Sequence, residues 1–200
     1  MAFDEATVAE IVRQRLGITD AAEKARVIWA IPQALDRLAR KIAQNPKKRP
    51  LLMTSRATAI TLTNAAVDLN AYAANAANKK ILVEYLDHGT IWYEGSDLPD
   101  ATIKQRPMQR VRNPAFAGNS QHLSHPFAAD YVFYALEGGT LRCIEVEIGN
   151  PLGGPISMIT PYSPKLTELA GIVELHDEFI DKVVEVYLQP GNDSAEDAEK

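Results

Sequence analysis

The longest helical pattern in the sequence spans residues 20–44. Its apolar side chains recur at intervals of three and four, which places them on one helical face: Ala25, Ile28, Trp29, Leu35, Leu38, Ala39 and Ile42. Asp20 and Glu23 form a variant of a capping box at its start. Pro32 lies inside the pattern and lacks a backbone donor, so we expect a kink or a break there. Trp29 falls on the apolar stripe and is predicted to be a core residue.

Helical patterns also occur at both ends of the chain. A short helix is predicted over residues 4–16, with Gly17 as a left-handed stop. A closing helix is predicted over residues 174–188, with six apolar residues on one face: Leu175, Phe179, Ile180, Val183, Val184 and Tyr187. Residues 192–200 are acidic without a large apolar side chain, which predicts a mobile tail.

Between the helices, alternating and β-branched segments predict strands. Asn64 is expected to turn a hairpin between strands at 58–63 and 67–69. Strands are predicted at 81–86 and 90–93, joined by a turn at 87–89, and a short last strand at 156–160. Gly138 and Gly139 predict a hairpin between strands at 131–136 and 140–148, because paired glycines accept positive φ.

Residues 101–129 show neither a helical nor a two-residue period. They contain four cations and no acidic side chain: Lys104, Arg106, Arg110 and Arg112. A loop of this length in a compact domain is usually functional or is ordered by a partner. We therefore expect a long basic loop that contacts either phosphate or acidic patches on a neighbouring copy. A solvated loop without any partner is the third alternative.

Together these elements predict an α+β fold, with an N-terminal helical bundle, an antiparallel β-portion carrying the basic loop, and a C-terminal helix. The chain has 200 residues, 46% of them hydrophobic and 24% charged, which suits one domain over residues 1–191 followed by the acidic tail. The net charge of -5 argues against a general nucleic-acid binder. We expect a protein made in a cytoplasm, or an assembly built there, since no apolar run is long enough for a membrane span and the start is acidic.

Candidate catalytic and metal-binding residues are few. His122 and His125 have a metal-like spacing, but no further ligand is near in sequence, so surface histidines are the favoured interpretation. His176 is explained by a solvated helix start and His88 by a turn. Cys143, the only cysteine, is predicted to be buried as a small apolar residue. The cations at residues 47–49 follow a helix end, where the helix dipole favours positive charge.

The order of the elements resembles the head-to-tail adaptor (connector) proteins of tailed bacteriophages. The residues that carry this resemblance are apolar patterns in the helices and one apolar segment between them: Trp29-Ala30-Ile31-Pro32, Ala34-Leu35, Leu38-Ala39, Ile42-Ala43, residues 81–86, Phe179-Ile180 and Val183-Val184. The resemblance implies a ring-forming structural subunit of the virion neck that binds the portal protein and tail components. It implies no catalytic residue, cofactor or metal, and contact with DNA only during passage through the ring.

Under this hypothesis, two groups of residues are expected to contact the portal or a neighbouring subunit. The first is the basic group Lys104, Arg106, Arg110 and Arg112, and the second is Phe179, Ile180, Val183 and Val184 on a docking arm. The competing interpretation of the arm is that its helix packs onto the N-terminal helices as ordinary core. Two other functions stay open: a small hydrolase or other enzyme using His88, His122 or His125 with distant carboxylates, and a stand-alone binding module using the basic loop.

Overall fold

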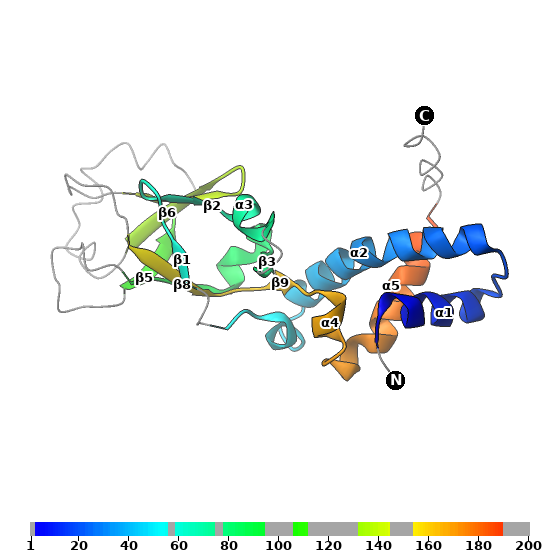
Figure 1. Ribbon diagram of the computed structural model, residues 1–200. Coiled ribbons are helices and arrows are strands. Elements are labelled where there is room, and N and C mark those ends of the chain that lie inside the picture. Colours follow the sequence, from blue (N-terminus) through cyan, green and yellow to red (C-terminus); the bar gives the residue numbers. More distant parts are fainter. Residues whose placement is uncertain are drawn as a thin grey trace, which may run out of the picture. The chain divides into compact units, whose positions relative to one another are not determined.

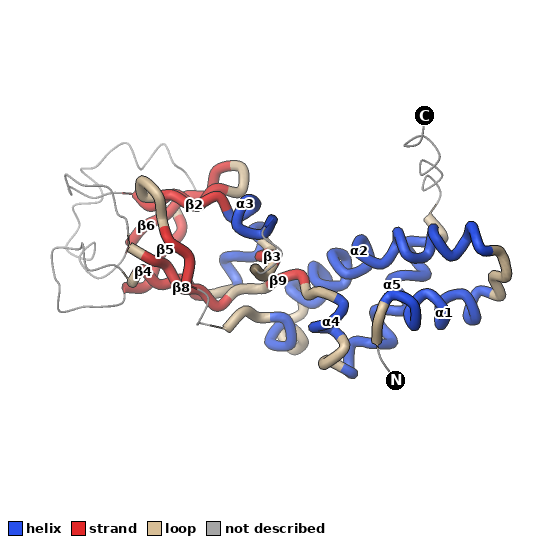
Figure 2. The backbone as a smooth tube through the Cα atoms, viewed as in Figure 1, coloured by secondary structure: helices blue, strands red, loops and turns tan. Residues whose placement is uncertain are grey.

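The computed structural model describes residues 3–55, 59–74, 78–94, 106–111, 132–144 and 154–189. Two compact units are present: a helical unit formed by Met1–Leu52 with Ser163–Lys200, and a β unit formed by Met53–Tyr162. The predicted α+β class is confirmed. Along the sequence, helices occur near both ends of the chain and the strands lie between them (Figures 1 and 2). The prediction of one domain over residues 1–191 stays a prediction, because compact units can belong to one folding domain. The predicted tail at 192–200 lies outside the described residues.

The helical unit begins with α1 (Glu5–Leu16), which is capped at both ends, at its C-terminus by the predicted Gly17. The side chain of Asp4 accepts a hydrogen bond of 2.8 Å from the backbone N–H of Thr7, and this bond lowers the pKa of Asp4. Gly17 has a φ of 67° and donates its N–H to carbonyls of the last turn. A left-handed glycine therefore ends the helix and lets the chain turn.

The longest helix, α2 (Ala21–Gln44), continues through Pro32, so of the expected kink or break the break does not occur. A proline inside a helix costs about 3 kcal/mol through its lost hydrogen bond and its clash with the preceding turn. Ile31 and Ala34, on either side of it, are buried, and packing of this kind offsets such a cost. At the end of α2, Arg49 donates from Nε to the carbonyl of Ala43 at 2.7 Å, which confirms that a cation caps this terminus.

The helical unit is completed by α4 (Leu166–Leu169) and α5 (His176–Tyr187), with the 3-10 helices Arg49–Leu52 and Val173–Leu175. The helix α5 packs along α2 and also contacts α1 (Figure 1). Tyr187 bonds Glu23 near the start of α2, whereas Glu178 bonds Lys41 near its end. The two helices are therefore antiparallel.

The β unit is built on a seven-stranded mixed sheet of strand order β1-β8-β4-β5-β6-β7-β2. Its strands are β1 (Ala59–Thr61), β2 (Ala66–Asp68), β4 (Thr90–Tyr93), β5 (Arg106–Arg110), β6 (Val132–Glu137), β7 (Thr140–Ile144) and β8 (Pro155–Ile159). The predicted hairpin at Gly138 and Gly139, now β6–β7, is confirmed. The two-residue strands β3 (Lys80–Ile81) and β9 (Tyr162–Ser163) form a separate pair, and α3 (Leu69–Ala74) follows β2.

Of the hairpin expected at Asn64, the turn and one bridge form, but the two strands β1 and β2 do not pair with each other beyond it. Asn64 and Ala65 have φ values of 50° and 59°, and Thr63 and Ala66 exchange two backbone hydrogen bonds of 2.8 and 3.1 Å. Beyond this bridge, β1 pairs with β8 and β2 with β7, at opposite edges of the sheet. The sheet therefore curls until its edge strands meet at one turn, which leaves little unpaired edge there.

Three predictions for the β unit are corrected. The strand expected at 81–86 is mostly the 3-10 helix Val83–His88. Leu82 and Leu86 are buried while Glu84 between them is exposed, which the two-residue alternation of a strand would not give. Part of the expected loop at 101–129 is the strand β5, which Pro107 obscured in the sequence. The sheet is not wholly antiparallel, since β5 and β6 are parallel.

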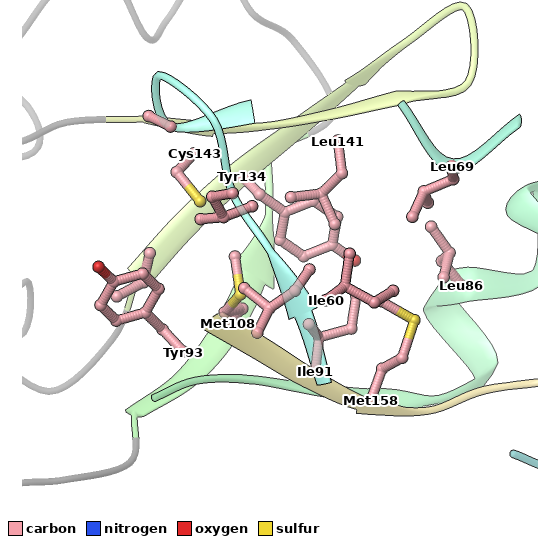
Figure 3. Close-up of a cluster of buried hydrophobic side chains, with 14 of the residues drawn as sticks. Ile60, Leu69, Leu86, Ile91, Tyr93, Met108, Tyr134, Leu141, Cys143 and Met158 are labelled. Atoms are coloured by element: carbon pink, nitrogen blue, oxygen red, sulfur yellow. The ribbon is translucent and has the colours of Figure 1, made fainter. Parts of the chain in front are cut away.

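The core of the β unit lies inside the curled sheet (Figure 3). Tyr93, Ile156 and Met158 are almost fully buried there, and Cys143 is buried as predicted. A Cβ atom at Gly89 would lie 2.3 Å from the carbonyl oxygen of Ile159, so only glycine lets β4 approach β8 at this point. The closed core leaves the outer sheet and the helix faces as the surfaces available to partners.

Candidate interaction surfaces

The four cations expected to form a basic contact surface do not share one environment. Arg106 begins β5 and is only 4% exposed, whereas Arg110 ends the same strand and is exposed. Lys104 and Arg112 lie outside the described residues. Of the predicted basic group, Arg110 is thus the member that the described surface presents to a partner.

A hollow of about 320 Å³ surrounds Arg110. The guanidinium of Arg110 lies 3.1 Å from the carboxylate of Asp87, and the two side chains form an ion pair. The hollow is lined by Leu86, Asp87, Gly89, Ile91, Met108, Gln109, Arg110 and Tyr134. Burial, followed by the negative charge of Asp87, raises the pKa of Tyr134 to about 12. At neutral pH Tyr134 is therefore a neutral phenol, suited to hydrogen bonding and not to nucleophilic attack.

Among the described residues, the histidine considered for an enzyme, His88, does not line this hollow. His88 neighbours Tyr85, with 5.6 Å between the ring centroids. His122 and His125 lie outside the described residues. His176 stacks on Phe3, and its Nε2 lies 3.0 Å from the carbonyl oxygen of Leu169. Within the described part of the chain, no group of three histidine, cysteine or acidic side chains is placed to hold a metal ion.

The helix α5 contributes an inner face to the core of the helical unit. Phe179, Ile180 and Val183 are buried there, and Val184 is half-buried. The structure thus matches the alternative in which these residues are core, and the first three are not available to contact a portal. Glu178 fastens the helix further, because its carboxylate oxygens lie 2.7 Å from Lys41 and 2.6 Å from Lys48. Hydrogen bonds from these lysines lower the pKa of Glu178.

The outer face of α5 and of the turn before it is strongly acidic. Four exposed carboxylates recur at intervals of three and four residues: Glu174, Asp177, Asp181 and Glu185. Two large apolar side chains lie at the ends of this segment, Val173 with 73% and Leu188 with 62% of its surface exposed. We call the four carboxylates together with Leu188 the α5 acidic face.

The exposed side of α2 carries an apolar surface that was not among the predicted contact residues. Trp29 is 41% exposed, which contradicts its predicted place in the core. Ala25 and Pro32 beside it on the helix are exposed, and Ile28 is half-buried. These four residues form what we call the Trp29 face. The signal was present in the sequence, because residues 27–31 are five consecutive apolar residues and point in all directions around a helix.

No known protein family model matches the chain, and no curated protein matches it either. None of the described helices is long and apolar enough to cross a membrane.

Proposed function

We propose that this chain is a structural subunit of the head-to-tail connector ring of a tailed bacteriophage. The observation that carries the proposal is the Trp29 face. A large aromatic side chain exposed next to other apolar residues is typical of a surface that binds another protein, and tryptophan is enriched among residues that dominate binding energy. Trp29 stands on a long helix whose opposite side is well packed, so its exposure is not a result of a poorly formed core.

The resemblance in the order of elements specifies the kind of assembly. Such connector proteins combine helices from both ends of the chain with β-structure between them, and this chain has the same order. Because the inner face of α5 is buried, we expect the docking surfaces on the exposed sides of α2 and α5 instead. The net charge of -5 is consistent with protein partners and with DNA that only passes through the ring.

In this function the chain works by assembly. Copies bind one another around a ring in the virion neck, after synthesis in the host cytoplasm, and the ring binds the portal protein on one side and tail components on the other. Each contact is between two different surfaces of the same chain, as cyclic rings require. Catalysis, a cofactor and a membrane have no part in this mechanism.

Electron microscopy of the full-length chain, alone and mixed with the portal protein encoded in the same genome, tests this function. We expect rings in the presence of portal, and the variant Trp29→Glu should reduce their number strongly. The matched control is Ala6→Glu on the exposed side of α1, which should form rings as the wild type does. Isolated chains in every mixture would contradict the proposal.

A further inference from the structure

A positive charge, that of Arg40, lies on α2 at a defined distance from Trp29. Arg40 is exposed on the same side of α2, eleven residues after Trp29. Eleven residues are close to three helical turns, so the two side chains point in nearly the same direction about 16 Å apart. A partner that covers Trp29 along the helix therefore also meets a guanidinium.

The α5 acidic face presents the complementary pair at the same spacing. Leu188 is 62% exposed, and the exposed Asp177 precedes it by eleven residues. An apolar side chain and a carboxylate thus lie about three turns apart on one side of α5. The order along the chain is reversed relative to α2, where the apolar residue comes first.

We infer that the Trp29 face of one copy binds the α5 acidic face of a second copy, with the two helices antiparallel. In this register Leu188 packs on Trp29 while Asp177 pairs with Arg40, which also keeps an interaction within its own copy. Packing of the apolar residues supplies affinity, and the opposite charges fix the register and the choice of partner. The inference rests on the proposed ring, for which it names the surfaces that join neighbouring subunits.

The middle of the contact brings Asp36 of α2 toward Asp181 of α5, but both carboxylates have partners within their own copy. The hydroxyl of Ser163 donates to Asp36 at 2.6 Å, and Arg15 lies 2.5 Å from Asp181. These interactions reduce the repulsion between the two acidic groups.

Within one copy the inner face of α5 packs on α2, so its outer face points away from that helix. The Trp29 face therefore does not meet the α5 acidic face of its own copy, and the inferred contact joins two copies. A contact between two different surfaces repeats from copy to copy and generates rings or filaments.

Charge exchange in the full-length chain tests the contact. Association on the portal is measured by sedimentation for Arg40→Asp, for Asp177→Arg and for the chain carrying both. Each single variant should associate at least about tenfold more weakly, and the double variant should recover to within about threefold of the wild type. Circular dichroism checks that each variant folds. Single variants that associate normally, or a double variant that does not recover, would overturn the inference.

A cross-linking experiment keeps the contact testable without portal. Arg40→Cys and Asp177→Cys are mixed at high concentration with a short bifunctional maleimide, and Cys143 stays unreactive because it is buried. We expect a covalent dimer of the two variants and none when either is mixed with Gln14→Cys, an exposed control on α1. Rings without this cross-link or the charge rescue would reject the contact but keep the proposed function. The specific cross-link in a chain that never forms rings would keep the contact and reject the function.

Discussion

The carboxylate of Glu178 on α5 lies 2.7 Å from the ammonium of Lys41 on α2. Lys48, beyond the end of α2, holds the other carboxylate oxygen at 2.6 Å, and the Glu178 side chain is 17% exposed. This interaction pairs the start of α5 with the end of α2. Hydrogen bonds from both lysines lower the pKa of Glu178, and the bond to Glu178 raises the pKa of Lys41.

Replacing Glu178 by glutamine should lower the free energy of unfolding by about 1–2 kcal/mol at neutral pH, because two partly exposed ion pairs are lost. The folded-state pKa of Glu178 lies below the ordinary 4.5, so its contribution is present above that pH and is lost as the pH falls through the folded pKa. Urea unfolding of the wild type and of Glu178→Gln at several pH values measures this. Glu174→Gln, at an exposed position, is the control, and a difference that persists in strong acid would contradict the account.

The buried inner face of α5 predicts that truncating Phe179 destabilises the helical unit. Phe179→Ala should cost about 3–5 kcal/mol, because a large side chain is removed from a packed core. Val184→Ala, at a half-buried position on the same helix, should cost clearly less. Deleting residues 172–200 should therefore yield an unfolded or aggregated helical unit. A folded truncated chain by circular dichroism would show instead that α5 is a separable arm.

Arg106 and Arg110 should respond differently to charge reversal. Arg106→Glu places a carboxylate where the arginine is 4% exposed, and it should lower the free energy of unfolding by about 3 kcal/mol or more. Arg110→Glu places a second carboxylate next to Asp87 at a partly exposed position, and it should lower the free energy of unfolding by about 1 kcal/mol or less. Thermal unfolding of both variants, with Arg110→Gln as a neutral control, measures the difference. Equal losses would contradict the environments described for the two side chains.

Tyr134 should ionise at a higher pH than an ordinary tyrosine. Its pKa of about 12 exceeds the ordinary value of 10 because the phenol is buried and faces the charge of Asp87. The unfolded chain releases this proton near pH 10, so stability should fall between pH 10 and 12. Tyr134→Phe should remove that part of the pH dependence. Tyrosinate absorbance, followed together with unfolding, tests the assignment, and a Tyr134 that titrates near pH 10 would refute it.

The sequence predicted those elements whose signals are local. The stop of α1 at Gly17, the hairpin at Gly138 and Gly139 and the closing helix are correct, because a left-handed glycine, a pair of turn glycines and a helical period act within a few residues. The pairing of β1 with β8 and of β2 with β7 was not predictable in this way. Those pairs join segments far apart in the chain, and the turn at Asn64 suggested a simple hairpin instead.

The candidate surfaces were harder to predict than the fold. The period of α5 identified an apolar face correctly, but a period cannot tell whether that face packs within the chain or binds a partner. Trp29 shows the converse, because an aromatic residue on an apolar stripe was assigned to the core although α2 presents it to solvent. Arg106 and Arg110 looked alike in the sequence, and strand alternation places both on the same face of β5. Arg106 is nevertheless buried at the start of the strand and Arg110 exposed at its end, because their tertiary surroundings differ.

Native mass spectrometry of the full-length chain mixed with the portal protein from the same genome tests the central claim most directly. The account predicts complexes in which several 22.0 kDa chains are bound to one portal ring, with a fixed number of copies that does not change as the chain is added in excess. A chain that is detected only at the mass of the monomer, at every concentration and with portal present, would contradict it.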